Sequence, residues 1–119
     1  MSKIALDEGV SEDIAIHLPG HGVQSVSQLG LKGTKNGQLL AAIEAGRFRA
    51  FISNDKRLEF DQNVSRRPFA VLLLSTNHWP TVKLHVGSIV KALETAKPGT
   101  ITKVDCGRFV ARKLRRPTM

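Results

Sequence analysis

Acidic residues follow two short apolar segments of this 119-residue chain. Asp7 and Glu8 come directly after the apolar residues 4–6, and Asp55 follows the apolar residues 50–52. Carboxylates that converge in a cleft repel one another, and a hard cation with oxygen ligands, such as Mg²⁺ or Mn²⁺, relieves that repulsion. Such a cation orients a phosphodiester and lowers the pKa of an attacking water. If the acids meet, they predict metal-assisted phosphodiester hydrolysis.

Each acid also has a purely structural interpretation. An Asp just after a strand often caps the next helix or makes a turn. Glu8 follows Asp7 directly, and neighbouring residues of an extended chain point to opposite faces. Both interpretations of these acids stay open on the sequence alone.

Strand and helix signals alternate along the chain and must position these acids. Strands are expected over residues 3–6, 23–26, 49–53, 69–74 and 100–104, with helices at 11–18, 38–45, 56–64 and from 80 to before 98. Residues 69–74 are continuously apolar, as is typical of a strand buried on both faces of a parallel sheet. We therefore predict an α/β fold with a single doubly wound, mostly parallel sheet and helices on both faces. The last strand could be antiparallel or an edge.

The carboxyl edge of such a sheet is where ligands bind. If the first and third strands are neighbours, as in the flavodoxin-like order, Asp7 and Asp55 face each other there. Polar residues expected nearby, which would position a phosphate or a water, are Lys35, Asn36, Lys56 and Asn77. Solvated surface is the alternative interpretation for the lysines.

The net charge of +8 is unevenly distributed. Residues 108–119 hold five Lys or Arg and no acid, whereas residues 1–107 hold 13 basic and ten acidic residues, a net charge of +3. We expect one domain over 1–107 and a basic tail over 108–119. Such a tail is a solvated segment, or it docks on nucleic acid or on an acidic partner.

Cysteine content and hydropathy favour a cytoplasmic protein. The single cysteine, Cys106, cannot form an internal disulfide, which indicates a reducing compartment. No apolar run approaches the roughly 18 residues of a membrane helix. The first ten residues lack the layout of a secretory signal.

About residues 3–104 of the sequence resemble a family of small PIN-like domains. The resemblance is carried by residues 6–8, Ser11, 21–23, 29–40, 51–58, 62–64, 70–74, Asn77 and 93–99. Members resemble VapC-type toxins and are regarded as ribonuclease toxins of type II toxin–antitoxin pairs. Well-studied PIN nucleases use three or four acids around Mg²⁺ or Mn²⁺ to cut RNA. The resemblance implies metal ligation by Asp7 and Asp55, assistance from Glu8, and RNA, a small antitoxin and a second copy of the chain as partners.

Two alternatives stay open beside the nuclease. Related domains often carry an acid where residues 34–37 stand here; Asn36 brings no charge, and affinity for Mg²⁺ follows ligand charge. The chain is then a catalytically weak or inactive module that binds RNA or a protein. The lesser alternative is a phosphoacceptor receiver-like domain, whose pattern is matched by Asp7, Glu8, Asp55, Thr76 and Lys103.

Overall fold

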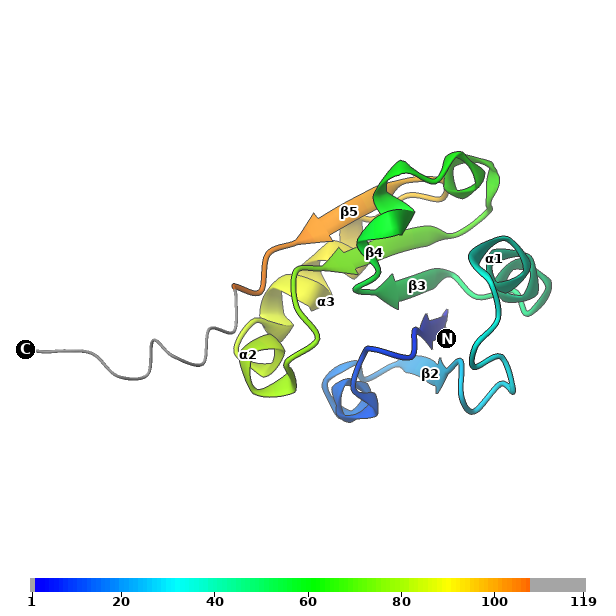
Figure 1. Ribbon diagram of the computed structural model, residues 1–119. Helices are drawn as coiled ribbons and strands as arrows, with labels where there is room; N and C mark the ends of the chain where they lie inside the picture. Colours follow the sequence, from blue (N-terminus) through cyan, green and yellow to red (C-terminus); the bar gives the residue numbers. More distant parts are fainter. Residues whose placement is uncertain (1, 108–119) are drawn as a thin grey trace, which may run out of the picture.

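Five parallel strands form one sheet in the computed structural model, which describes residues 2–107 (Figure 1). The strands are β1 (Ser2–Leu6), β2 (His21–Ser25), β3 (Ala50–Ser53), β4 (Ala70–Leu74) and β5 (Ile101–Val104). Their order is β2-β1-β3-β4-β5, and every neighbouring pair is parallel. The predicted α/β fold is confirmed, and the last strand is a parallel edge strand.

The chain reverses its direction of travel across the sheet between β1 and β3. It first runs from β1 to β2 on one side, then crosses back to β3 and continues through β4 to β5. This is the flavodoxin-like order, in which ligands bind outside the carboxyl ends of the two strands at the reversal. Leu6 of β1 pairs with Ile52 of β3, so the residues that follow them leave the sheet side by side.

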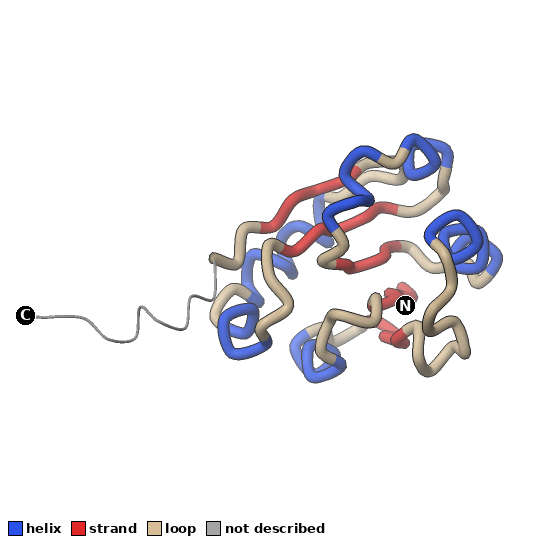
Figure 2. The backbone as a smooth tube through the Cα atoms, in the orientation of Figure 1, coloured by secondary structure: helices blue, strands red, loops and turns tan. Residues whose placement is uncertain are grey.

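Helices cover both faces of the sheet, as the tube view shows (Figure 2). One face carries α1 (Asn36–Ala45) and the 3₁₀ helices η2 (Lys56–Phe60) and η3 (Gln62–Arg66), which share one core cluster. The other carries the 3₁₀ helix η1 (Glu12–His17), α2 (Trp79–Lys83) and α3 (Val86–Thr95), which share a second. Alternate strand residues supply the two clusters, Ala5 and Phe51 to the first and Leu6 and Ile52 to the second.

The two central strands are the most deeply buried. Every residue of β3 and of β4 is buried, as expected for strands covered on both faces. The edge strands β2 and β5 are only partly buried. The long apolar run therefore belongs to the middle of the sheet, where its sequence placed it.

Several predicted helices differ in detail from the observed ones. The helix expected over 56–64 is two 3₁₀ turns, because Asp61 ends η2 and its carboxylate caps η3 by accepting from the Asn63 amide at 2.9 Å. The helix expected after Pro80 is broken into α2 and α3 at His85, whose backbone is not helical. The helix after Ser11 is 3₁₀ throughout.

Some strand and helix boundaries also differ from those expected from the sequence. The second strand begins at His21, because its register with β1 pairs Ser2 with His21. The first α-helix begins at Asn36, with Lys35 extended as its N-cap. The predicted basic tail lies outside the described residues. Within residues 2–107, no helix is both long and apolar enough to cross a membrane.

Candidate functional site

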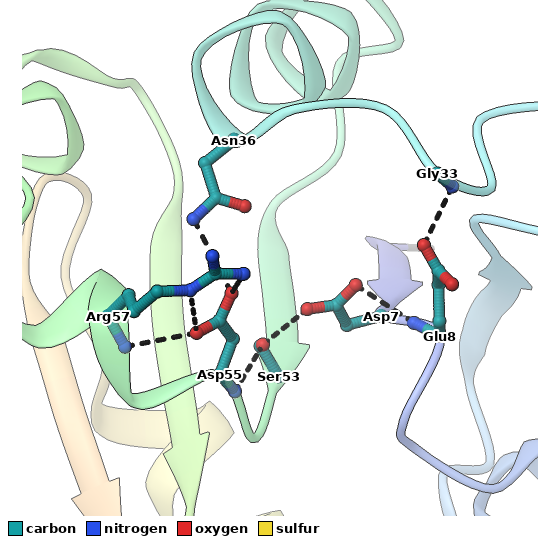
Figure 3. A network of polar contacts seen from close by, with 7 residues as sticks. All are labelled: Asp7, Glu8, Gly33, Asn36, Ser53, Asp55 and Arg57. Atoms are coloured by element: carbon teal, nitrogen blue, oxygen red, sulfur yellow. Dashed lines mark hydrogen bonds and ion pairs between the residues drawn. The ribbon is translucent and has the colours of Figure 1, made fainter.

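Asp7 and Asp55 come together at the carboxyl edge of β1 and β3 (Figure 3). Asp7 extends the pairing of the two strands, because its backbone amide donates to the Ile52 carbonyl at 2.9 Å. Asp55 lies two residues beyond the end of β3. Both side chains are half-buried. The structure thus places the two acids at the reversal point of the sheet.

Ser53 joins the two acids. Its hydroxyl donates to Asp7 Oδ2 at 2.5 Å and accepts from the Asp55 backbone amide at 3.0 Å. The side chain is fully buried at the end of β3, so its hydroxyl depends on these partners. Ser53 was not among the site residues expected from the sequence. A lone serine that closes an apolar strand just before an acid was the signal available.

Asp55 is engaged on both carboxylate oxygens. Oδ1 caps η2 by accepting from the Arg57 amide at 3.0 Å, and also accepts from Arg57 Nε at 3.0 Å. Oδ2 accepts from an Arg57 terminal nitrogen at 2.9 Å and from Asn36 Nδ2 at 3.5 Å. The Arg57 side chain is 83% exposed while that of Asp55 is 19% exposed, so the guanidinium covers the carboxylate from the solvent side.

The charge of Arg57 shifts the titration of this pair. Hydrogen bonds from the Arg57 side chain lower the pKa of Asp55 below its usual value, although burial of the carboxyl acts in the opposite direction. The same contact raises the pKa of Arg57, with a smaller contribution from the charge of Asp7. The Asp55 carboxyl is therefore ionised at neutral pH.

Glu8 turns away from the other two acids. Its backbone amide donates to Asp7 Oδ1 at 2.8 Å, while its carboxylate accepts from the Gly33 amide at 2.7 Å (Figure 3). Gly33 has a φ of 81°, a left-handed conformation that suits glycine. In this arrangement Glu8 anchors the loop before α1. It therefore acts on Asp7 and Asp55 only indirectly, by holding that loop beside them.

A groove of about 530 Å³ opens beside the acids. Its lining residues are Glu8, Gly33, Thr34, Lys35, Asn36 and Arg57. Two of the predicted phosphate-positioning residues, Lys35 and Asn36, thus line this groove, and Asn36 also contacts Asp55. The groove offers cationic and amide groups on the side of the site that faces solvent.

The other two predicted positioning residues lie elsewhere on the same edge. Lys56 lines a separate hollow together with Lys103 and Glu59. Asn77 is exposed in the segment between β4 and α2, outside the network of Figure 3. Thus α1 and the η2 turn bring Lys35, Asn36 and Lys56 to this edge, whereas Asn77 stands apart from the acids.

The residues suggested by the receiver-like alternative have other partners. Lys103 Nζ pairs with Glu59 at 2.6 Å, and Thr76 Oγ1 accepts from the His78 amide at 3.2 Å. Asp55 itself is paired with Arg57. The strand order fits a receiver domain as well as it fits any flavodoxin-like protein, but these side-chain contacts leave Thr76 and Lys103 with partners other than Asp55.

The oxygen donors at the site fit a hard divalent cation by type. The carboxylates of Asp7 and Asp55 and the amide oxygen of Asn36 are the ligands that Mg²⁺ and Mn²⁺ prefer. Across residues 2–107, no three His, Cys, Asp or Glu side chains are grouped so that they could hold a metal ion. A cation at Asp55 would also have to displace the exposed side chain of Arg57, which bonds both carboxylate oxygens.

Comparisons with protein-family models, with curated proteins and with solved structures gave no match for this chain. Function is therefore inferred from the strand order and from the geometry at the β1–β3 edge.

Proposed function

We propose that this chain is a PIN-like domain that acts as a metal-dependent endoribonuclease, the toxin of a type II toxin–antitoxin pair. The observation that carries the proposal is the pairing of Asp7 and Asp55 through Ser53 at the reversal point of the sheet. An α/β sheet of this order binds its ligand at that point. The resemblance to PIN-like domains assigns a nuclease's acids to the same two residues.

Asp7 and Asp55 would hold Mg²⁺ or Mn²⁺. Asn36, whose Nδ2 faces Asp55, would serve as a neutral oxygen donor once its amide group turns over. When bound, the cation supplies charge stabilisation on the phosphodiester and lowers the pKa of the attacking water. The chain's own groups supply position. Ser53 fixes the Asp7 carboxylate, Glu8 holds the loop that carries Lys35, and Lys35 and Arg57 attract the RNA backbone to the groove.

The proposed partners follow from this role. RNA is the substrate, a small antitoxin protein is the cognate inhibitor, and a second copy of the chain is the third proposed partner. The location that goes with these partners is the cytoplasm, where the chain would meet both RNA and a small antitoxin.

A second candidate is an RNA- or protein-binding module that does not cut. The specific observation in its favour is the Arg57 guanidinium, which satisfies both oxygens of Asp55 without any metal. A site with two carboxylates also has little charge with which to attract a cation. Binding of RNA that is independent of Mn²⁺ and is not followed by cleavage would favour this candidate.

The nuclease proposal is tested by incubating the purified chain with mixed RNAs and Mn²⁺ or Mg²⁺. Metal-dependent cleavage is expected from the wild type and is expected to vanish in Asp7→Asn and Asp55→Asn. Asn caps helices as well as Asp does, so the second change preserves the start of η2. Asp61→Asn is the matched control, because Asp61 caps η3 in the same manner. Equal cleavage by all four proteins, or none, would overturn the proposal.

A further inference from the structure

A second hollow, of about 320 Å³, opens on the same carboxyl edge of the sheet. It lies where η2 passes over the ends of β4 and β5, and Lys56, directly after Asp55, is part of its wall. Lining residues are Lys56, Glu59, Leu73, Leu74, Ser75, Lys103, Val104 and Asp105. The hollow and the candidate site are therefore adjacent in the sequence, because Lys56 directly follows Asp55.

The floor of this hollow is apolar and its rim is charged. Leu73 and Val104 are almost fully buried, and Leu73 pairs with Lys103 across β4 and β5. Above them the Lys103 ammonium bonds Glu59 Oε2 at 2.6 Å. An apolar floor bordered by hydrogen-bonding groups suits a nucleobase, whose faces are apolar and whose edge is polar.

The rim offers acceptors as well as cations. Glu59 uses Oε2 for Lys103 and keeps Oε1 for another donor, and its side chain is 30% exposed. Ser75 is already engaged, because its hydroxyl donates to the Gly107 carbonyl and accepts from the Cys106 amide. A carboxylate accepts hydrogen bonds and donates none, so it favours the amino groups of adenine, cytosine or guanine. Uracil has no amino group, and its one donor, N3–H, lies between two carbonyl oxygens that repel a carboxylate.

Lys56 is placed to hold the phosphate of the same nucleotide. Its side chain is exposed and makes no hydrogen bond or ion pair with the other described residues. Its neighbour Asp55 is at the candidate cleavage site, so a strand whose phosphate lies at Asp55 reaches the hollow with an adjacent base.

We propose that this hollow binds a base of single-stranded RNA, and that Glu59 selects bases that carry an amino group. The inference rests on the proposed function for its ligand, RNA, and adds the residue that determines base preference. Glu59 acts here by hydrogen bonding to substrate and takes no part in the cleavage chemistry.

Fluorescence anisotropy in EDTA tests the inference without any cleavage. The probes are short labelled oligoadenylate, oligocytidylate and oligouridylate, with unlabelled AMP as a competitor. The wild type is expected to bind the first two about tenfold more tightly than oligouridylate. Glu59→Gln is expected to tighten binding of all three, because a negative charge is lost, and to bring their affinities close to one another.

Two further variants separate base selection from charge and from folding. Glu59→Asp keeps the charge but shortens the reach, and it is expected to lose the same preference. Glu44→Gln is the matched control: Glu44 pairs with Arg67 at 2.9 Å on another part of the surface, and its loss should leave the preference unchanged.

A wild type that binds all three oligonucleotides equally, or binds none, would overturn the inference. So would a preference that persists in both Glu59 variants, or AMP that binds as tightly as oligoadenylate, which would indicate a site for free nucleotides. Absence of metal-dependent cleavage with the base preference intact would remove the nuclease function and leave the base pocket standing. Metal-dependent cleavage without a base preference would support the nuclease function and remove the base pocket.

Discussion

At the scale of single residues, Arg57 determines whether the Asp55 carboxylate is accessible to a cation. Its guanidinium meets both carboxylate oxygens, with distances of 3.0 and 2.9 Å from its side-chain nitrogens. The sequence shows Arg57 two residues after Asp55 but does not show which of several neighbouring acids or phosphates it contacts. Its conformation depends on the η2 turn, which the sequence did not show, because one continuous helix was expected over residues 56–64.

Removal of this guanidinium is expected to strengthen cation binding. Arg57→Gln frees Asp55 from a competing positive charge, so its affinity for Mn²⁺ should rise by about two- to fivefold, the scale of an exposed ion pair. Isothermal titration calorimetry measures it. Arg66→Gln, which removes the same charge from an exposed position on η3, is the control. An affinity that is unchanged or weaker in Arg57→Gln would show that Arg57 does not compete with the cation.

The same contact predicts a pH dependence of stability. The pKa of Asp55 is lower in the folded chain than its ordinary value of 3.8, chiefly because Arg57 bonds the charged form. The ion pair therefore stabilises the fold above that value, and the stabilisation is lost as the pH falls through the folded pKa. Urea unfolding should show a stability gap between wild type and Arg57→Gln that is constant above about pH 5 and closes in more acidic solution. A gap that widens on acidification would contradict this.

At the scale of the elements, Ser53 connects β1, β3 and η2. The strands themselves were predictable, because residues 69–74 and 50–52 are apolar throughout and belong to the middle of a parallel sheet. The junction was not, since a hydroxyl shared by Asp7 and the Asp55 amide depends on the register of β1 against β3. Local pattern likewise could not show that Asp61 divides one expected helix into two 3₁₀ turns.

Loss of the Ser53 hydroxyl is expected to cost stability. Ser53→Ala leaves the Asp55 amide and Asp7 Oδ2 without this partner in a buried place, so the free energy of unfolding should fall by about 1–3 kcal/mol. Urea denaturation measures it. Ser65→Ala removes an exposed hydroxyl that bonds the Gln62 carbonyl, and should change stability by less than about 0.5 kcal/mol. Equal effects of the two changes would argue against the buried junction.

At the scale of the whole molecule, the sheet order sets the site. The sequence predicted the fold class and the conditional statement that Asp7 and Asp55 meet if β1 and β3 are neighbours, and the structure meets that condition. The strand order itself depends on contacts between residues far apart in the chain, such as Leu6 with Ile52. The direction of Glu8 toward Gly33 has the same origin, because it follows from where the loop before α1 lies.

The charge of the whole chain predicts how RNA binding responds to salt. Residues 108–119 carry five of the 18 Lys and Arg. If they contact RNA, their removal should reduce the slope of log affinity against log salt by up to about 3.5, since each neutralised phosphate of a single strand contributes about 0.7. A full-length variant with these five residues changed to Gln controls for chain length. An unchanged slope would place the phosphate contacts within residues 1–107.

The central claim is that Asp7 and Asp55 form one cation site at the reversal point of the sheet, and titration of the purified chain with Mn²⁺ tests it most directly. Calorimetry should show one Mn²⁺ bound by the wild type and by Asp61→Asn, with affinity lower by at least about tenfold in both Asp7→Asn and Asp55→Asn, because each loses a charged oxygen donor. Equal affinity in all four proteins, or the loss of binding in only one of the two site variants, would contradict a shared site.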